Sequence, residues 1–208
     1  MDRREHWDRV YSAKSPVELT WFQETPTVSL ELIKETGLGP EQWVFDVGGG
    51  TSTLPSFLLD EGFRNLSVLD VSERAIATAK AQLGERAKGV EWFGTDLLEF
   101  EPPHRWALWH DRAVFHFLTS LEDRDEYCRV LELGLEPGGH LIIATFALDG
   151  PLKCSGLDVV RYSPESLQAV LGPEYQLRGS LEEVHATPSG GTQNFIYTWF
   201  QRIEATQP

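Results

Sequence analysis

Hydrophobic positions along this chain fall into short continuous runs and into sets spaced three or four residues apart. Short apolar runs bounded by turn residues predict buried strands, and the spaced sets predict amphipathic helices. The runs predict strands over 42–46, 65–70, 90–93, 106–110 and 140–146. The spaced sets predict helices over 2–13, 26–36, 53–61, 72–83, 112–118 and 121–134, with a further helix opening at Ser163. Two longer β segments, about 175–186 and 192–203, flank Gly190-Gly191 and predict a hairpin.

This order of elements predicts an α/β fold. Strands that alternate with helices indicate a mostly parallel sheet with helices on both faces, and the closing hairpin indicates an antiparallel edge. We therefore expect a single domain over 1–208, with an N-terminal helical lid over 1–40 and a core over 41–208.

A glycine turn follows the first strand of the predicted core. The segment Asp46-Val47-Gly48-Gly49-Gly50-Thr51-Ser52 comes after an apolar run and before a helical pattern. Glycines at such a junction let the backbone approach a ligand at a helix N-terminus. A carboxylate at Asp46 is unfavourable beside a dinucleotide pyrophosphate, and Thr53 stands where that motif requires Gly or Ala. S-adenosylmethionine is a cation without phosphate and is compatible with an acid there.

Further acidic residues close the next two predicted strands. Asp70, followed by Val71, lies 20 residues after Gly50, the distance expected for a carboxylate that binds a ribose diol. Asp96 and Leu97 follow the third strand. A carboxylate there is suited to bind the amino group of adenine, and Leu97 is suited to pack against the adenine ring. Asp also caps helices and starts turns. Three carboxylates at successive strand ends nevertheless favour a ligand site.

On the segment from Asp46 to Ser52, on Asp70 and on Asp96-Leu97, the chain resembles the class I S-adenosylmethionine-dependent methyltransferases. The resemblance runs from about Glu41 to the C-terminus, and Ser52 departs from it where many members carry Gly. It implies methyl transfer on a Rossmann-like seven-stranded sheet, with S-adenosylmethionine over the carboxyl ends of the first strands. The implied cofactor-binding residues in the core are Asp46, Gly48, Gly49, Gly50, Ser52, Asp70, Val71, Asp96, Leu97 and His110.

The predicted lid carries the aromatic residues Trp7, Tyr11, Trp21 and Phe22. This pattern is similar to the N-terminal segment of some small methyltransferases, among them bacterial small-molecule enzymes and protein-lysine enzymes. The resemblance implies that Trp7, Tyr11 and Trp21 contact the cofactor and exclude water. Packing on the core is the alternative for each ring.

Candidate chemistry follows the fourth predicted strand, because ligands bind at the carboxyl edge of such sheets. We expect His110 and Asp111 to be catalytic, since histidine is a general base near neutral pH. Arg112, His116 and Tyr162 are candidate substrate-binding residues. The alternative role for Asp111 is to cap the following helix. The alternative for His116, which lies between two Phe residues, is a position in the hydrophobic core.

Composition narrows the class of function. The net charge of -14 lacks the basic footprint of nucleic-acid binding. No apolar run approaches the roughly 18 residues of a membrane span, and the N-terminus lacks the apolar core of a signal peptide. With only Cys128 and Cys154, we expect a reducing, cytoplasmic location. The spacing of His and Cys matches no standard zinc pattern, so we expect no metal.

The sequence favours an S-adenosylmethionine-dependent methyltransferase that acts on a small molecule by in-line displacement. Three alternatives remain open: a protein-lysine N-methyltransferase, a cofactor-binding module without catalysis, and an NAD-binding oxidoreductase. The acceptor atom, the need for a general base and the oligomeric state are left undetermined.

Overall fold

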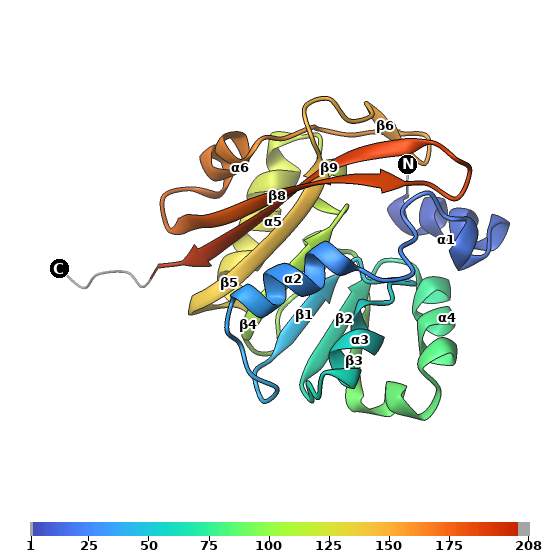
Figure 1. Cartoon of the computed structure of the whole chain (residues 1–208), viewed down its shortest axis with the longest axis horizontal. Helices are drawn as coiled ribbons and strands as arrows, with labels where there is room; N and C mark the ends of the chain where they lie inside the picture. Colours follow the sequence, from blue (N-terminus) through green and yellow to red (C-terminus); the bar gives the residue numbers. More distant parts are fainter. Residues whose placement is uncertain (1, 204–208) are drawn as a thin grey trace.

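The computed structural model of this chain describes residues 2–203, which form a central sheet with helices on both sides (Figure 1). Seven strands pair in the order β3-β2-β1-β4-β5-β9-β8. Their bounds are β1 Val44–Val47, β2 Leu66–Asp70, β3 Val90–Gly94, β4 Trp106–Arg112, β5 Leu135–Phe146, β8 Tyr175–Ala186 and β9 Thr192–Arg202. The seven-stranded, mostly parallel sheet predicted for the core is confirmed.

Strand direction reverses only at the C-terminal hairpin of this sheet. The strands from β3 to β5 pair in parallel, β9 pairs antiparallel with β5, and β8 pairs antiparallel with β9. Gly190 has φ 85, a conformation in which glycine is favoured, and it lies in the turn of the predicted hairpin. At the centre of the sheet, β1 lies between β2 and β4, so the strand order reverses there. Such a reversal leaves a crevice at the carboxyl ends of the strands.

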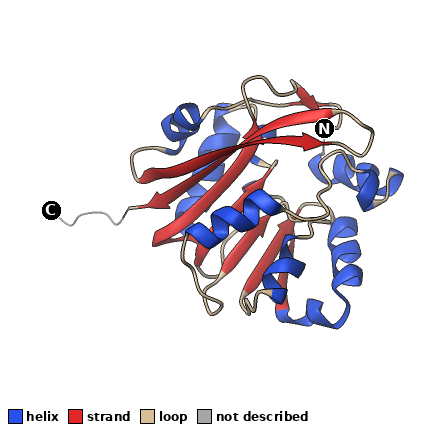
Figure 2. Cartoon of the chain, in the orientation of Figure 1, coloured by secondary structure: helices blue, strands red, loops and turns tan. Residues whose placement is uncertain are grey.

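Helices cover both faces because successive residues of the inner strands are apolar on both sides. Val44 packs into one core cluster with helices α2 (Thr27–Glu35) and α3 (Leu54–Asp60). Phe45 packs into the other with α5 (Leu121–Gly134) and α6 (Pro164–Leu171). Figure 2 shows α2 and α3 in front of the sheet and α5 behind it. The α4 helix (Glu73–Leu83) contacts β2 and β3.

The N-terminal segment lies over the carboxyl ends of the strands. It contains α1 (Arg3–Ala13) and the 3-10 turn η1 (Pro16–Glu18), and it leads into α2. Asp2 begins α1 as its N-cap, since its carboxylate accepts from the Glu5 amide. Helix α1 contacts α4, at the right of Figure 1.

The predicted helix over 112–118 is wrong. Strand β4 continues to Arg112, Ala113 adopts φ 68, and a single 3-10 turn η4 (Phe115–Phe117) follows. The cause is Asp111, whose carboxylate accepts from the Val114 and Phe115 amides and folds the backbone into a turn.

Smaller differences involve backbone geometry that hydrophobic periodicity does not encode. Strand β5 begins at Leu135, five residues before the predicted 140–146, and it contains Gly138 at φ 79. A short hairpin, β6 (Lys153–Cys154) with β7 (Leu157–Asp158), lies in the stretch after β5 for which no element was predicted. The remaining 3-10 turns are η2 (Gly84–Gly89) and η3 (Leu97–Glu99).

Candidate functional site

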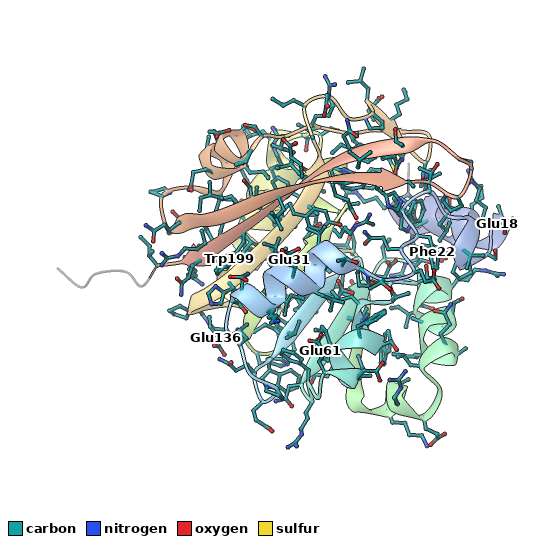
Figure 3. All side chains as sticks on the ribbon, in the orientation of Figure 1. Glu18, Phe22, Glu31, Glu61, Glu136 and Trp199 are labelled. Carbon is teal, nitrogen blue, oxygen red and sulfur yellow. The ribbon has the colours of Figure 1, made fainter. Side chains whose placement is uncertain are left out.

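Two neighbouring cavities lie at the point where the strand order reverses. We call the first the strand-end cavity, because its walls include Asp70 at the end of β2 and Asp96 after β3. We call the second the glycine-turn cavity, because its walls include Asp46 and Ser52 at the two ends of the glycine turn. Both cavities are lined by Tyr11, Trp21, Gly48 and Arg112. Phe22, labelled in Figure 3, also lines the glycine-turn cavity.

The glycine turn has no room for side chains. A Cβ on Gly48 would lie 2.1 Å from a methyl of Val114, and one on Gly49 would lie 2.6 Å from Asp46 Oδ2. A Cβ on Gly50 would lie 2.6 Å from Asp70 Oδ2 and 2.7 Å from the Tyr11 hydroxyl. Gly48 and Gly50 also have positive φ values of 64 and 36, which side chains rarely adopt. The turn therefore brings bare backbone close to two carboxylates.

A buried hydrogen-bonded chain holds Asp46. Its Oδ1 lies 2.7 Å from His110 Nδ1, and His110 Nε2 lies 2.9 Å from the hydroxyl of Ser29 on α2. All three residues are buried, and β1 and β4 place Asp46 directly opposite His110. Among the described residues, Asp46 Oδ2 has no hydrogen-bond partner. Both ring nitrogens of His110 are thus engaged, whereas Asp46 retains one free oxygen.

Asp70 lies at the end of β2, where it lines the strand-end cavity. Its Oδ1 accepts from the Ser72 amide at 2.8 Å. Burial, together with the nearby carboxylates of Asp46 and Asp8, raises the pKa of Asp70 to about 7, although the Ser72 amide lowers it. A cation beside these acids would lower that pKa, whereas a phosphate would raise it again.

The third strand end is tied to the N-terminal helix. Asp96 begins η3 by accepting from the Leu98 amide, and its other oxygen pairs with Arg3 at 3.2 Å. Arg3 also pairs with Asp123 at the start of α5, at 2.6 Å. Leu97, Leu98, Val71 and Arg3 all line the strand-end cavity. Asp96, the carboxylate predicted to bind adenine, therefore also contacts the predicted lid through Arg3.

Trp7, Tyr11 and Trp21 of the predicted lid form one cluster with Phe117 over the strand-end cavity. Trp7 packs edge-on against Trp21 at 5.7 Å and against Phe117 at 5.1 Å between ring centroids. Tyr11 packs against Trp21 at 6.1 Å. All four rings line the strand-end cavity. These rings therefore pack against one another and also line the cavity.

Arg112 joins the lid to the C-terminal hairpin. Its Nη1 donates to the Trp21 carbonyl at 2.9 Å, and its Nε donates to the Tyr197 hydroxyl at 2.7 Å. The guanidinium carbon lies 4.6 Å from the centre of the Phe195 ring, and Nη2 lies 3.7 Å from Glu183 Oε2. Within residues 2–203, Nη2 is buried and has no hydrogen-bond partner.

Three candidate residues lie apart from the two cavities, whose described walls do not include them. Asp111 is fully buried and accepts from the Val114 and Phe115 amides and the Tyr127 hydroxyl. Burial raises the pKa of Asp111 to about 6, although those hydrogen bonds lower it. Asp111 therefore holds the turn after β4, whereas the alternative left open by the sequence was a cap of a helix that does not form.

His116 and Tyr162 are also buried. His116 Nδ1 lies 3.4 Å from the Phe146 amide, and burial lowers the pKa of His116 to about 3. Tyr162 lines a separate cavity that also includes Asp149 and Glu183. No cluster of three or more His, Cys, Asp or Glu side chains suited to a metal ion occurs in the part of the chain that the structure describes. Among the same residues, no helix has the length and apolar composition needed to cross a bilayer.

Several residues of the site were not predicted from the sequence. Ser29 contacts His110, which in turn contacts Asp46, and Arg3 pairs directly with Asp96. Val114 and Phe117 form apolar parts of the cavity wall. The sequence did contain a signal for Arg3, because a basic residue in a lid over acidic strand ends is favourably placed to form an ion pair. Ser29 carries no such signal, since it occurs within an ordinary helical pattern.

No protein-family model matches the chain. Among curated proteins, it is 31% identical over 127 residues to N-terminal Xaa-Pro-Lys N-methyltransferase 1-B of Xenopus laevis, a match that covers 56% of each chain. It is 32% identical over 127 residues to N-terminal Xaa-Pro-Lys N-methyltransferase 1 of Mus musculus, again over 56% of each. The chain therefore spans about half the length of the curated relatives that it matches.

Solved structures are similar over nearly the whole chain. A protein studied for the conversion of a disulfide bond into a thioacetal group during echinomycin biosynthesis has a TM-score of 0.77 at 19% identity, covering 99% of this chain and 95% of that one. The N-methyltransferase NodS of Bradyrhizobium japonicum, in complex with S-adenosyl-l-homocysteine, has a TM-score of 0.74 at 17% identity over 98% and 100%. The 1,6-didemethyltoxoflavin-N1-methyltransferase of Burkholderia thailandensis has a TM-score of 0.69 at 17% identity over 97% and 84%.

At these identities the likeness shows the fold. The chain has the Rossmann-like fold of the S-adenosylmethionine-dependent methyltransferases, and the fold implied by the sequence resemblance is confirmed.

Proposed function

We propose that this protein is an S-adenosylmethionine-dependent methyltransferase. The observation that carries the proposal is the pair of buried carboxylates, Asp46 and Asp70, on either side of a glycine turn at the reversal of strand order. This arrangement suits a cationic nucleoside and opposes a pyrophosphate. The methyltransferases named above, with the same fold, support it.

The residues fit the parts of the donor in order along the two cavities. Asp70 would bind the ribose, Asp96 and Leu97 the adenine, and Asp46 the ammonium. When bound, S-adenosylmethionine supplies a methyl group on a sulfonium leaving group. The protein's part is to position the donor and exclude water. We propose that residues 1–40 serve as the lid of a single domain and that Trp7, Tyr11 and Trp21 perform the exclusion.

We further propose that the acceptor is a small molecule. Aromatic rings of the N-terminal segment line the strand-end cavity, and Arg3 of the same segment pairs with Asp96, which supports a site too confined for a large acceptor. The 1,6-didemethyltoxoflavin-N1-methyltransferase of the same fold was solved with 1,6-didemethyltoxoflavin bound.

A protein acceptor is the second candidate, because the curated relatives are N-terminal Xaa-Pro-Lys N-methyltransferases. Its test offers the enzyme labelled S-adenosylmethionine with either a lysate protein fraction or a filtrate of small metabolites. Label in the filtrate is the expected result. Label in protein, removed by competition with a peptide that begins Xaa-Pro-Lys, would replace the small-molecule proposal.

Calorimetry tests the cofactor directly. We expect S-adenosylhomocysteine to bind and NAD to fail to bind at the same concentration. Binding of NAD with no response to S-adenosylhomocysteine would end the methyltransferase proposal and favour an oxidoreductase. Binding of S-adenosylhomocysteine with no turnover on any acceptor would favour a cofactor-binding module.

A further inference from the structure

Two side chains able to accept a proton near the site, His110 and Asp111, are already engaged. His110 contacts Asp46 and Ser29 through its two nitrogens. Asp111 accepts from two backbone amides and from Tyr127 at 2.9 Å. A general base must reach the proton that it removes within hydrogen-bond distance. Neither side chain is among the described walls of the strand-end cavity.

The polar groups of the strand-end cavity divide into two sets. Its acidic residues, Asp70 and Asp96, lie at the ends of the second and third strands, where the proposed donor places its adenosine. Its other polar side chains include Arg112, Cys154 and Tyr11, whose hydroxyl lies at Gly50 beside Asp70. Burial raises the pKa of Tyr11 well above 10 and the pKa of Cys154 to about 11. At neutral pH these three side chains therefore offer N–H, O–H and S–H donors rather than a base.

Arg112 is held rigidly in this wall. Contacts with the Trp21 carbonyl, the Tyr197 hydroxyl and the Phe195 ring restrain its guanidinium. Glu183 lies 3.7 Å from Nη2 in an ion pair, and Nη2 is buried without a hydrogen-bond partner among the described residues. The positive charge of Arg112 in this wall favours an acceptor with an anionic atom over a protonated amine, whose N–H groups are donors and whose charge has the same sign.

We infer, on the basis of the proposed methyltransferase function, that the acceptor is a small thiol that reacts as its thiolate. A thiol with a pKa of about 8.5 is partly ionised at neutral pH without a general base, whereas a lysine amine with a pKa of about 10.4 is almost fully protonated. The aromatic walls formed by Trp7, Trp21 and Phe117 also favour a soft, weakly hydrated sulfur over a carboxylate.

The transfer balances without a base. A sulfur lone pair of the acceptor forms a new bond to the methyl carbon. The bond from that carbon to the donor sulfonium breaks, and its electron pair remains on the donor sulfur. The products are a methyl thioether and S-adenosylhomocysteine. The acceptor's proton has already passed to water on ionisation, so no side chain takes it up.

Binding to the complex with S-adenosylhomocysteine tests the inference without turnover. The probe is thiophenol, whose thiolate absorbs in the near ultraviolet, and methyl phenyl sulfide is its neutral counterpart. We expect the complex to bind the thiolate at least about tenfold more tightly than the sulfide, with an affinity that rises through the pKa of the thiol. Equal affinities for the two ligands at all pH values would overturn the inference.

Arg112→Gln is expected to reduce thiolate affinity at least about tenfold while S-adenosylhomocysteine still binds. The matched control is Lys153→Gln, which removes a neighbouring but exposed cation, paired with Asp158 at 2.8 Å. Equal losses in the two variants would overturn the role of Arg112. If Arg112→Gln does not fold, the wild-type comparison of thiolate with sulfide decides the inference.

Turnover separates this inference from the function on which it rests. With two thiols of different pKa, the inflection of the pH–rate profile should move with the acceptor. An inflection that stays fixed would indicate an enzyme base and overturn the inference. Methylation of an Xaa-Pro-Lys peptide with no reaction on thiols would overturn it while preserving the methyltransferase proposal. A protein that binds neither S-adenosylmethionine nor S-adenosylhomocysteine would remove both.

Discussion

His110 Nδ1 lies 2.7 Å from Asp46 Oδ1, and both side chains are almost completely buried. Neighbouring strands create this contact, because parallel pairing sets the two residues directly opposite each other. Ser29 completes the chain on the other side of the ring. The imidazole therefore orients a carboxylate of the glycine turn, and we assign it a positioning role.

Replacing His110 should destabilise the protein. His110→Phe leaves Asp46 Oδ1 and the Ser29 hydroxyl buried without partners, and each lost partner costs about 1–3 kcal/mol. Denaturant unfolding should show this loss, whereas Ser29→Ala should cost less because it removes a single hydroxyl. Unfolding free energies of His110→Phe equal to wild type would contradict the buried chain.

Asp70 should contribute strongly to cofactor affinity. Removing the charged acceptor of a ribose hydrogen bond in Asp70→Asn should weaken S-adenosylhomocysteine binding by about 1.5–3 kcal/mol, measured by calorimetry. Asp60→Asn is a matched control, since Asp60 pairs with Arg86 at an exposed position far along α3. A similar affinity in the two variants would exclude Asp70 as the ribose ligand.

The same residue should affect stability with a defined pH dependence. Burial raises the pKa of Asp70 from 3.8 to about 7, so the folded state holds this proton more tightly than the unfolded chain does. The resulting stabilisation is complete below about pH 4 and is lost as the pH rises through about 7.

Ligand-free Asp70→Asn, which stays neutral, should therefore be more stable than wild type at pH 8 by at least about 1 kcal/mol. The advantage should shrink toward pH 5. Melting temperatures measured across this range check the prediction, and parallel curves for the two proteins would oppose it.

Asp111 should behave as a structural residue. Asp111→Ala leaves two backbone amides and the Tyr127 hydroxyl without their acceptor, so the expected loss is at least about 2 kcal/mol of unfolding free energy. Tyr127→Phe removes one of these bonds and should cost about 1 kcal/mol. A stable Asp111→Ala protein that binds S-adenosylhomocysteine but has lost turnover would instead support a catalytic role.

Trp7 should report on lid closure. Trp7→Ala removes ring contacts with Trp21 and Phe117 over the cavity, and the loss of closure should weaken S-adenosylhomocysteine binding at least about fivefold. Val17→Ala, at an exposed position of the same segment, is the control. If neither variant changes the affinity, closure by the N-terminal segment does not contribute to binding.

The sequence by itself determined the order and type of most elements. Hydrophobic periodicity is a local property, and it located the parallel strands, the helices between them and the hairpin around Gly190. It also placed Asp46, Asp70 and Asp96 at one edge, because parallel strands end on the same side of a sheet. The helix predicted over 112–118 failed because a single carboxylate, Asp111, redirects the backbone after β4.

Only the tertiary structure decided what the polar side chains contact. Ser29 meets His110 across 81 positions, and Arg112 meets Trp21 across 91 and Tyr197 across 85. A hydrogen bond requires its two atoms to come within about 3 Å, and no local pattern encodes which distant segments do so. Strand position predicts a catalytic His110, and only the packed structure reveals that its ring lies between Asp46 and Ser29 of α2.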